Sequence, residues 1–213
     1  MNKREILDKC KLPDAFADAK PVESATLWGW HGEHPVFEAV IAEARPRLII
    51  EVGSWMGLPT VSMARALKKH GLFNTVIICV DTWLGSIEHW LEDEWRPNLE
   101  LAGGYPSFYK NFISNILQTG HAGDVVPLPM PSLMGARFLS AHGIQADVIY
   151  IDGSHEEEDV YRDAKAYWEL LAPGGMLFGD DFPLPGVGQG VMCFAKEAGV
   201  QCQTSDVYWM VKK

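Results

Sequence analysis

The chain has 213 residues, of which 47% are hydrophobic and 22% charged, and its formal net charge is -10. This charge argues against a nucleic-acid or anionic-membrane binder, because both partners require a basic protein face. Four scattered cysteines, with no apolar membrane span and no signal-peptide core, predict a single cytoplasmic domain over residues 1–213.

Apolar runs, glycines and prolines predict alternating strands and helices along the chain. The first 45 residues are expected to form a helical, lid-like segment that ends in an amphipathic helix over 35–44. Strands are then expected at 48–52, 75–80, 125–128, 147–151, 174–179, 200–204 and 207–211. Helices are expected at 59–70, 132–142, 156–171 and 187–198. This alternation predicts an α/β fold, a Rossmann-like doubly wound seven-stranded sheet that is mostly parallel with one antiparallel strand near the C-terminus.

The segment 84–110 interrupts this alternation. It carries Trp90, Trp95, Tyr105 and Phe108 together with several acidic residues. About 25 residues outside a sheet is long for a connection and is more often functional than idle. Because the segment follows the second strand, we predict a lid or substrate wall above the carboxyl ends of the strands; the alternative is a surface helix with aromatic anchors.

Acidic residues end two of the expected strands. Asp152 follows one apolar run, and Asp180 and Asp181 follow the next. Ligands of open α/β sheets bind beyond the carboxyl ends of the strands, and neighbouring strands lie about 4.8 Å apart. Three carboxylates that converge there repel one another unless a cation or a proton lies between them. The sequence therefore predicts a hard divalent metal or acid–base chemistry at this edge.

The turn after the first strand combines an acid with two glycines. Glu51 ends the strand, and Gly53 and Gly57 flank the turn that follows. This is not the GxGxxG pattern of a dinucleotide site, and an acid here suits a ligand that bears an ammonium group. An ordinary strand–helix turn is the alternative interpretation. Asp81, at the end of the second strand, can accept both hydroxyls of a ribose or can cap a helix.

These motifs resemble those of a known enzyme family. The strings EVGSWMG, VDTW and VIYIDGSHEEEDV…GDDF look like class I S-adenosylmethionine-dependent methyltransferases. The resemblance covers roughly residues 35–200 and is greatest to the bacterial group of macrolide-sugar O-methyltransferases and proteins labelled cephalosporin hydroxylases. Pro59 replaces the family's usual serine or threonine, so its contact with the cofactor moves to Thr60 or is lost. The resemblance implies that S-adenosylmethionine binds to Glu51, Gly53, Ser54, Gly57, Thr60, Asp81, Thr82, Trp83, Ser132 and Asp152.

The resemblance also implies a metal and a base. The spacing of 28 and 29 residues from Asp152 to Asp180 and Asp181 is similar to the metal-ligand spacing of catechol O-methyltransferase, which implies that these three residues hold Mg²⁺. His155 stands where the catechol enzymes place a lysine base, so Asp152 and His155 are the expected catalytic residues. A capping role for His155 is the alternative. Another group, His31, Glu33 and His34, is expected to be solvated or substrate-facing.

The resulting hypothesis is an S-adenosylmethionine-dependent, Mg²⁺-dependent O-methyltransferase. Its acceptor would be a hydroxyl on a sugar, polyol or catechol-like small molecule, and the tryptophans of 84–110 favour a sugar. A homo-oligomer is compatible with the sequence. The alternatives are a metal-dependent hydroxylase, against which the lack of a two-histidine, one-carboxylate set argues, and a non-catalytic cofactor-binding module, which would have no use for costly buried acids.

Overall fold

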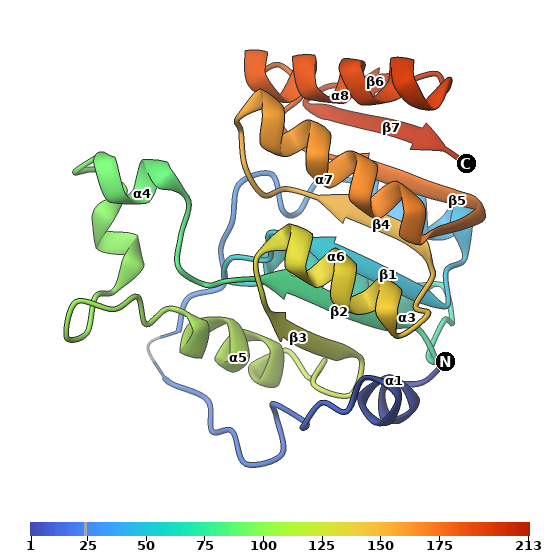
Figure 1. Cartoon of the computed structure of the whole chain (residues 1–213). Helices are drawn as coiled ribbons and strands as arrows, with labels where there is room; N and C mark the ends of the chain where they lie inside the picture. Colours follow the sequence, from blue (N-terminus) through green and yellow to red (C-terminus); the bar gives the residue numbers. More distant parts are fainter. Residues whose placement is uncertain (24) are drawn as a thin grey trace.

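The computed structural model describes residues 1–23 and 25–213 and contains one seven-stranded sheet (Figure 1). The strand order is β3-β2-β1-β4-β5-β7-β6. The strands are β1 (Leu48–Val52), β2 (Val76–Asp81), β3 (Val125–Pro129), β4 (Ala146–Ile151), β5 (Leu171–Gly179), β6 (Gln203–Ser205) and β7 (Tyr208–Lys212).

The pairing confirms the predicted fold class. Strands β1 to β5 pair in parallel, and β7 runs antiparallel to both of its neighbours, β5 and β6. The chain order reverses between β1 and β4, where a parallel sheet of this kind opens a crevice beyond the strand ends.

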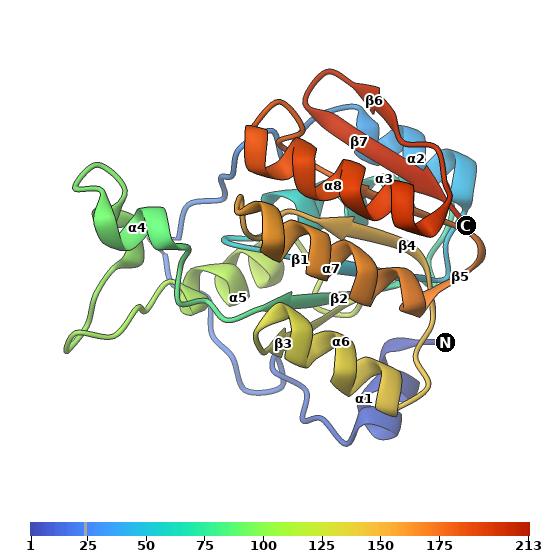
Figure 2. The ribbon, with the colours of Figure 1, turned by 45° about the horizontal axis from the view of Figure 1, so that its top comes forward.

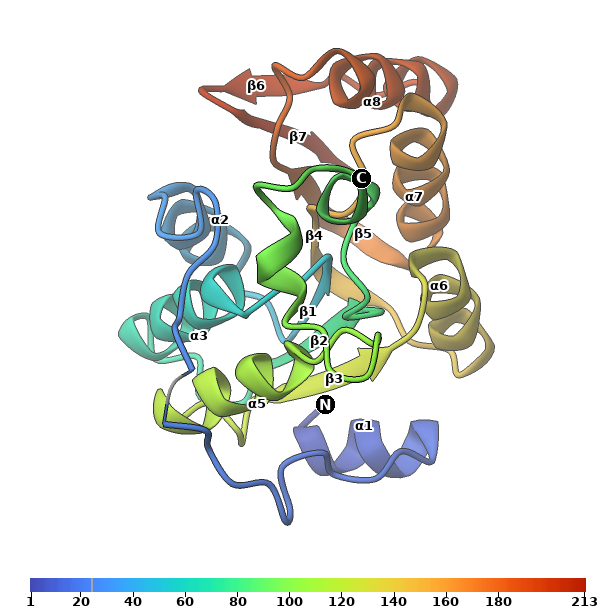
Figure 3. The same cartoon turned by 90° about the vertical axis from the view of Figure 1, so that its left-hand side faces the viewer.

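Helices cover both faces of the sheet, as Figures 2 and 3 show. The helices α2, α3 and α5 lie on one face, and α6, α7 and α8 lie on the other (Figure 3). The helices are α1 (Lys3–Cys10), α2 (Val36–Ala44), α3 (Leu58–Lys69), α4 (Ile87–Leu91), α5 (Tyr109–Gln118), α6 (Ser132–Ala141), α7 (Glu157–Leu170) and α8 (Pro185–Ala198), with a 3-10 turn η1 (Arg96–Leu99). None of those described is long and apolar enough to cross a membrane.

The apolar runs of the strands explain the two-sided core. Every residue of β1 is buried, and successive side chains of a strand point to opposite faces. Ile50 and Val52 pack into the cluster under α6, α7 and α8, whereas Ile49 packs with Phe37 and Phe112 in the cluster under α2, α3 and α5. A strand buried on both faces needs a continuous apolar run, which is why the sequence located β1, β2 and β4 within one or two residues.

Helix α5 was not predicted. Its apolar residues at positions 109, 112, 113, 116 and 117 recur at helical spacing, a signal that the sequence analysis overlooked, and three polar residues, Asn111, Ser114 and Asn115, are also buried. Asn115 donates through Nδ2 to the carbonyl oxygens of Thr26 and Met56, at 3.2 and 2.8 Å. These bonds tie α5 to the N-terminal segment and to the loop after β1, and they satisfy amide hydrogens that would otherwise be buried without partners.

The segment between β2 and α5 forms an arm. It contains α4 and η1 and extends from the side of the molecule toward which the parallel strands point (Figure 1). Figure 3 shows the arm in front of the carboxyl ends of the central strands. The predicted insertion therefore lies over the open edge of the sheet.

Candidate active site

A cavity of about 1150 Å³ lies at the carboxyl ends of the strands. The loops after β1, β2, β3, β4 and β5 all contribute to it, together with the arm and the N-terminal segment. The side chains and loops that line it include Trp30, His31, Gly53, Trp55, Asp81, Thr82, Glu88, His89, Trp95, Ser132, Asp152, His155, Asp163 and Asp181.

Gly53 allows the loops after β1 and β4 to cross closely. Its φ is 83°, in the left-handed region that favours glycine, and an added Cβ would lie 1.8 Å from the carbonyl oxygen of Asp152. The Gly53 amide donates to the carbonyl oxygen of Val80 at 2.9 Å. One glycine therefore holds the first loop against both β2 and the loop that carries Asp152.

Glu51 lies beneath this loop and not in the cavity. Its side chain is completely buried and accepts hydrogen bonds from Ser54 Oγ at 3.0 Å, from Cys79 Sγ at 3.2 Å and from the Thr60 hydroxyl. Burial raises the pKa of the carboxyl to about 7, while these hydrogen bonds oppose the rise. The arrangement gives Glu51, Ser54 and Thr60 a supporting role, which differs from the direct contact with a ligand's ammonium group expected from the sequence.

Asp81 organises two loops at the end of β2. Its Oδ2 accepts from the amides of Ser54 and Trp55, both at 2.9 Å, and its Oδ1 accepts from the amide of Trp83 at 2.7 Å. Burial raises its pKa, and the backbone donors oppose that rise. The carboxylate lines the cavity beside Thr82, whereas the Trp83 ring is buried and donates through Nε1 to the Trp55 carbonyl oxygen at 2.9 Å.

Ser132 and Asp163 form a polar pair on the side of the cavity next to α6 and α7. The Ser132 hydroxyl donates to Asp163, and Tyr167 donates to the Ser132 carbonyl oxygen at 2.8 Å. Burial raises the pKa of Asp163 to about 6. The sequence analysis missed Asp163. The signal for it was a charged residue four positions before Tyr167, on the same buried side of α7, where an acid needs a hydrogen-bond partner.

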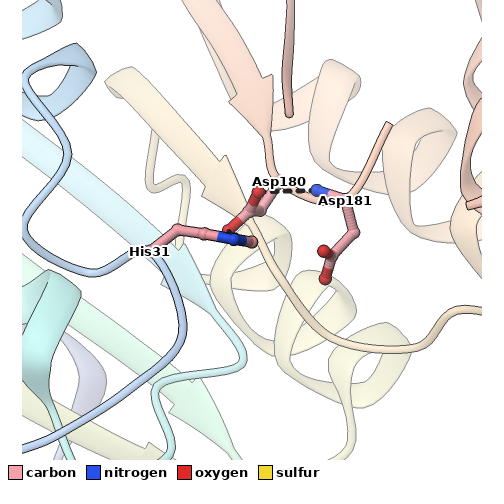
Figure 4. Close-up of side chains that lie close together, drawn as sticks. All are labelled: His31, Asp180 and Asp181. Carbon is pink, nitrogen blue, oxygen red and sulfur yellow. Dashed lines mark hydrogen bonds and ion pairs between the residues drawn. The ribbon is translucent and has the colours of Figure 1, made fainter. Parts of the chain in front are cut away.

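Asp152, after β4, and Asp181, after β5, line the cavity, and Figure 4 shows the buried Asp180 between Asp181 and His31. Asp180 is buried, and its Oδ1 accepts from the Asp181 amide at 2.7 Å. Its Oδ2 lies 3.0 Å from Nδ1 of His31, which comes from the N-terminal segment. Burial, followed by the charges of Asp180 and Asp181, raises the pKa of Asp152 to about 8.

Asp181 is shared by two groups of candidate ligands. The potential ligand atoms lie within 4.8 Å of one another in His31, Asp180 and Asp181, and again in Asp152, His155 and Asp181. In the described part of the chain, the predicted trio of Asp152, Asp180 and Asp181 does not form a group by itself. The structure thus adds an imidazole to each side of the acid cluster.

His155 connects the cluster to the arm. Its Nε2 lies 3.1 Å from Asp181 Oδ2, and its Nδ1 lies 3.5 Å from Glu88 Oε1 on α4. The hydrogen bond to Asp181 is the main reason that the pKa of His155 is raised to about 9. In this arrangement the imidazole is a cation at neutral pH, so it must lose a proton before it can act as the base that the resemblance implied.

Four cavity-region residues other than glycine have left-handed backbone conformations. The φ angles are 49° for His31, 47° for Trp55, 50° for Trp83 and 58° for Asp181. Such conformations are uncommon for these residue types, and strained residues concentrate at binding and catalytic sites. Their presence in separate loops around one cavity agrees with a functional site.

An aromatic wall, formed by Trp30, Trp55, His89 and Trp95, lines part of the cavity. The ring centroids of Trp30 and Trp95 are 5.3 Å apart, and those of Trp55 and His89 are 4.5 Å apart. His89 is buried, its Nδ1 bonds to Ser86 Oγ at 2.7 Å, and burial lowers its pKa, so its ring is neutral. Within the described residues, His89 Nε2 and Trp55 Nε1 are buried without hydrogen-bond partners. Because these two nitrogens are inaccessible, the wall presents ring faces to the cavity.

A family model described as a methyltransferase domain matches residues 50–182, more than half of the chain. The chain belongs to this methyltransferase family. Together with the strand order, this membership confirms the resemblance to class I S-adenosylmethionine-dependent methyltransferases and identifies the protein as an enzyme of that class.

Solved structures with the same fold include several O-methyltransferases. TomG from Streptomyces achromogenes, solved with SAM and involved in tomaymycin synthesis, is 16% identical over 98% of this chain and 86% of its own, with a TM-score of 0.62. NovP is 14% identical over 99% and 88%, with a TM-score of 0.64. CalS11, a TDP-rhamnose 3'-O-methyltransferase, is 15% identical over 83% and 77%, with a TM-score of 0.58. These likenesses establish the fold. A search of curated proteins finds no match.

The methyltransferase cavity separates the predicted cofactor residues into two sets. Those that line it are Gly53, Asp81, Thr82, Ser132 and Asp152. Those outside its lining are Glu51, Ser54, Gly57, Thr60 and Trp83, of which Gly57 has a φ of 90° and packs against Phe112. The first set can touch a ligand directly, and the second shapes the loops that carry it.

Proposed function

We propose that this methyltransferase transfers the methyl group of S-adenosylmethionine to a hydroxyl of a small molecule, a sugar or another polyol in preference to a catechol-like diol. The observation that carries the proposal is the single cavity in which the cofactor loops, the acid cluster and the aromatic wall meet. At about 1150 Å³ it is larger than the roughly 300–1,000 Å³ of most small-ligand sites, which suits a cofactor beside an acceptor.

The cofactor would lie across the loops after β1, β2 and β3. Asp81 would accept the ribose hydroxyls, because a carboxylate has about four lone-pair sites and three backbone amides use only part of them. Ser132 and Asp163 would meet the adenine end, and Gly53 would let the methionine end approach the backbone. TomG, whose structure contains SAM, supports this choice of cofactor.

The acid cluster fits a divalent cation such as Mg²⁺. Repulsion from Asp180 and Asp181 contributes to the raised pKa of Asp152, and a positive charge would offset that repulsion. Carboxylate oxygens are the hard donors that Mg²⁺ prefers. Asp152, Asp180 and Asp181 would hold the ion, which when bound would lower the pKa of the acceptor hydroxyl.

His155 would then receive the proton of that hydroxyl. Its hydrogen bond to Asp181 is the largest cause of its raised pKa, so a cation held by Asp181 would weaken that bond and lower the pKa toward its usual range. Glu88 would keep the ring oriented through Nδ1. Positioning the acceptor oxygen in line with the donor methyl would supply much of the remaining rate enhancement.

The aromatic wall supports a sugar or polyol acceptor. Trp30 and Trp95 line the cavity with their rings in contact, and the faces of such rings can stack on the apolar faces of a sugar ring. CalS11, a fold neighbour that methylates TDP-rhamnose, agrees with this class of acceptor. The comparisons give no support to a hydroxylase or to a non-catalytic module, and a homo-oligomer stays a prediction.

A methyl-transfer assay tests the proposal. Purified protein is incubated with isotopically labelled S-adenosylmethionine and panels of sugar nucleotides, free polyols and catechols, with and without a chelator. We expect labelled product from a sugar or polyol, lost with chelator and restored by a divalent cation. Transfer confined to catechols would overturn the acceptor class, and full transfer in excess chelator would overturn the metal.

A further inference from the structure

The N-terminal loop that carries His31 is fixed on both sides of that residue. Before it, Trp30 packs against Trp55 and Trp95, with centroids 6.0 and 5.3 Å apart. At His31 itself, the carbonyl oxygen accepts from the Tyr208 hydroxyl at 3.0 Å. After it, Gly32 lies so close to Leu58 that an added Cβ would be 2.7 Å from Leu58 Cγ. The loop is therefore held in place by four parts of the chain, the loop after β1, the arm, β7 and α3.

This fixed loop directs an imidazole at the acid cluster. His31 has a left-handed φ of 49°, and its Nδ1 lies 3.0 Å from Asp180 Oδ2 (Figure 4). Asp181, with its own left-handed φ of 58°, carries a carboxylate within 4.8 Å of these atoms. Two uncommon backbone conformations, in segments about 150 residues apart in sequence, thus bring one nitrogen and two oxygens together.

The distance between the His31 nitrogen and the Asp180 oxygen matches that between adjacent ligand atoms of an octahedral metal site. In an octahedral site with bonds of about 2.1 Å, adjacent ligand atoms are about 3.0 Å apart and opposite ones about 4.2 Å. The separation between His31 Nδ1 and Asp180 Oδ2 equals the first distance, and the 4.8 Å span of the group needs only small side-chain shifts to reach the second.

We infer that His31 is a nitrogen ligand of the metal centre and shifts its preference from Mg²⁺ toward a later transition metal such as Co²⁺ or Ni²⁺. Sites of carboxylate and water oxygens suit Mg²⁺ and Mn²⁺, whereas imidazole ligands suit the later transition metals. The inference rests on the proposed function only in that a cation binds among Asp152, Asp180 and Asp181. Its consequence is that the N-terminal segment, which the sequence analysis regarded as solvated or substrate-facing at this position, decides which ion the enzyme uses.

Two variants and one control separate this role from a structural one. His31→Asn tolerates a left-handed φ and replaces the nitrogen donor by an amide oxygen. His155→Gln removes the other imidazole near Asp181. The control is His34→Ala, in the same loop, whose ring lies 3.4 Å from Asp206 and belongs to neither group of candidate ligands.

The readouts are metal titration and pulsed electron paramagnetic resonance of Mn²⁺ bound to the full chain with S-adenosylhomocysteine. We expect ¹⁴N coupling in wild type, His155→Gln and His34→Ala, and its loss in His31→Asn. Co²⁺ affinity should fall about 10-fold or more in His31→Asn, while Mg²⁺ affinity changes about 2-fold or less. Thermal melting and S-adenosylhomocysteine binding should stay at wild-type values, which shows that the variant is folded.

The opposite results overturn the inference. It fails if ¹⁴N coupling persists in His31→Asn, if Mg²⁺ and Co²⁺ affinities fall equally, or if wild type binds no metal. A failure of the proposed function is distinct, because it is judged by methyl transfer. If methyl transfer depends on Mg²⁺ but no ¹⁴N coupling is seen, the proposed O-methyltransferase activity is supported and only the role of His31 as a ligand is rejected.

Discussion

The cavity is built from two regions that differ in how their residues are fixed. The loops after β1, β2 and β4 follow directly from buried strands, and backbone hydrogen bonds to Asp81 and the tight crossing at Gly53 hold them. The arm and the loop around His31 lie outside the sheet and are held by ring packing and single side-chain contacts. Under the proposed function, the first region would bind the cofactor, whereas the second would adjust the enzyme to its acceptor and its metal.

The largest expected effect belongs to Asp181, where the two regions meet. Asparagine tolerates the left-handed conformation at this position, so Asp181→Asn should fold normally while removing a charged ligand from both candidate groups. We expect turnover to fall on the order of 10²- to 10⁴-fold, the range attributed to acid–base catalysis, and metal affinity to fall with it. Methyl-transfer rates and metal titration measure both quantities.

S-adenosylhomocysteine affinity within about 2-fold of wild type is the accompanying control, since Asp181 belongs to the acceptor side. Asp180→Asn should behave similarly because it removes the neighbouring carboxylate. Near wild-type turnover of Asp181→Asn would show that the residue joining the two regions is not required for methyl transfer.

The next effect concerns stability and lies entirely in the strand-end region. Burial raises the pKa of Glu51 from 4.5 to about 7, so the folded state keeps a proton that the unfolded chain has released between these values. Folding therefore takes up a proton there, and stability falls as the pH rises through this window. At about 1.4 kcal/mol for each pH unit, the loss attributable to Glu51 is about 3 kcal/mol.

Urea denaturation of wild type and Glu51→Gln at several pH values between 4 and 8 measures this contribution. The free energy of unfolding of Glu51→Gln should rise relative to that of wild type as the pH increases to about 7. Above that pH the difference between the two proteins should stay constant. Glu169→Gln, on the exposed side of α7, is the matched control and should track wild type. Parallel curves for Glu51→Gln and wild type would show that Glu51 is already ionised in the folded protein.

A third effect tests the cofactor assignment of Asp81. Asp81→Ala should weaken S-adenosylmethionine binding by about 1.5–3 kcal/mol, the scale of a lost pair of charge-assisted hydrogen bonds. Asp81→Asn keeps one acceptor oxygen and should lose less. Calorimetric titration gives both values, and unchanged affinity in Asp81→Ala would remove Asp81 from the cofactor site.

The same contrast explains what the sequence could predict. Continuous apolar runs located the parallel strands, and residues directly after them, such as Asp81, Asp152 and Asp181, were placed at the cavity by strand geometry alone. His31 and Glu88 reach the site through the folding of an irregular loop and an arm, which leave no periodic signal. Glu51 was expected to contact a ligand, but the sequence could not reveal that Ser54, Thr60 and Cys79 would enclose its carboxylate outside the cavity.

The smallest expected effect tests the arm. Trp95 lines the cavity and packs on Trp30, whereas Trp90 is 40% exposed, lies outside the cavity lining and donates through Nε1 to the Leu84 carbonyl oxygen. Removing the Trp95 ring should cost the acceptor one stacking surface, worth roughly 0.5–1.5 kcal/mol beyond its buried area. We therefore expect Trp95→Ala to raise the acceptor's KM by about 3- to 10-fold.

Steady-state kinetics with the acceptor identified in the transfer assay measures this change, and S-adenosylmethionine affinity should be unaffected because the strand-end loops hold the cofactor. Trp90→Ala is the matched control: it removes the same side chain from the same arm, and it should leave the acceptor's KM within about 2-fold of wild type. Loss of cofactor affinity in Trp95→Ala would mean that the arm belongs to the cofactor site. Equal effects of the two substitutions would mean that the arm contributes only through its folding, because their positions relative to the cavity differ while the removed side chain is identical.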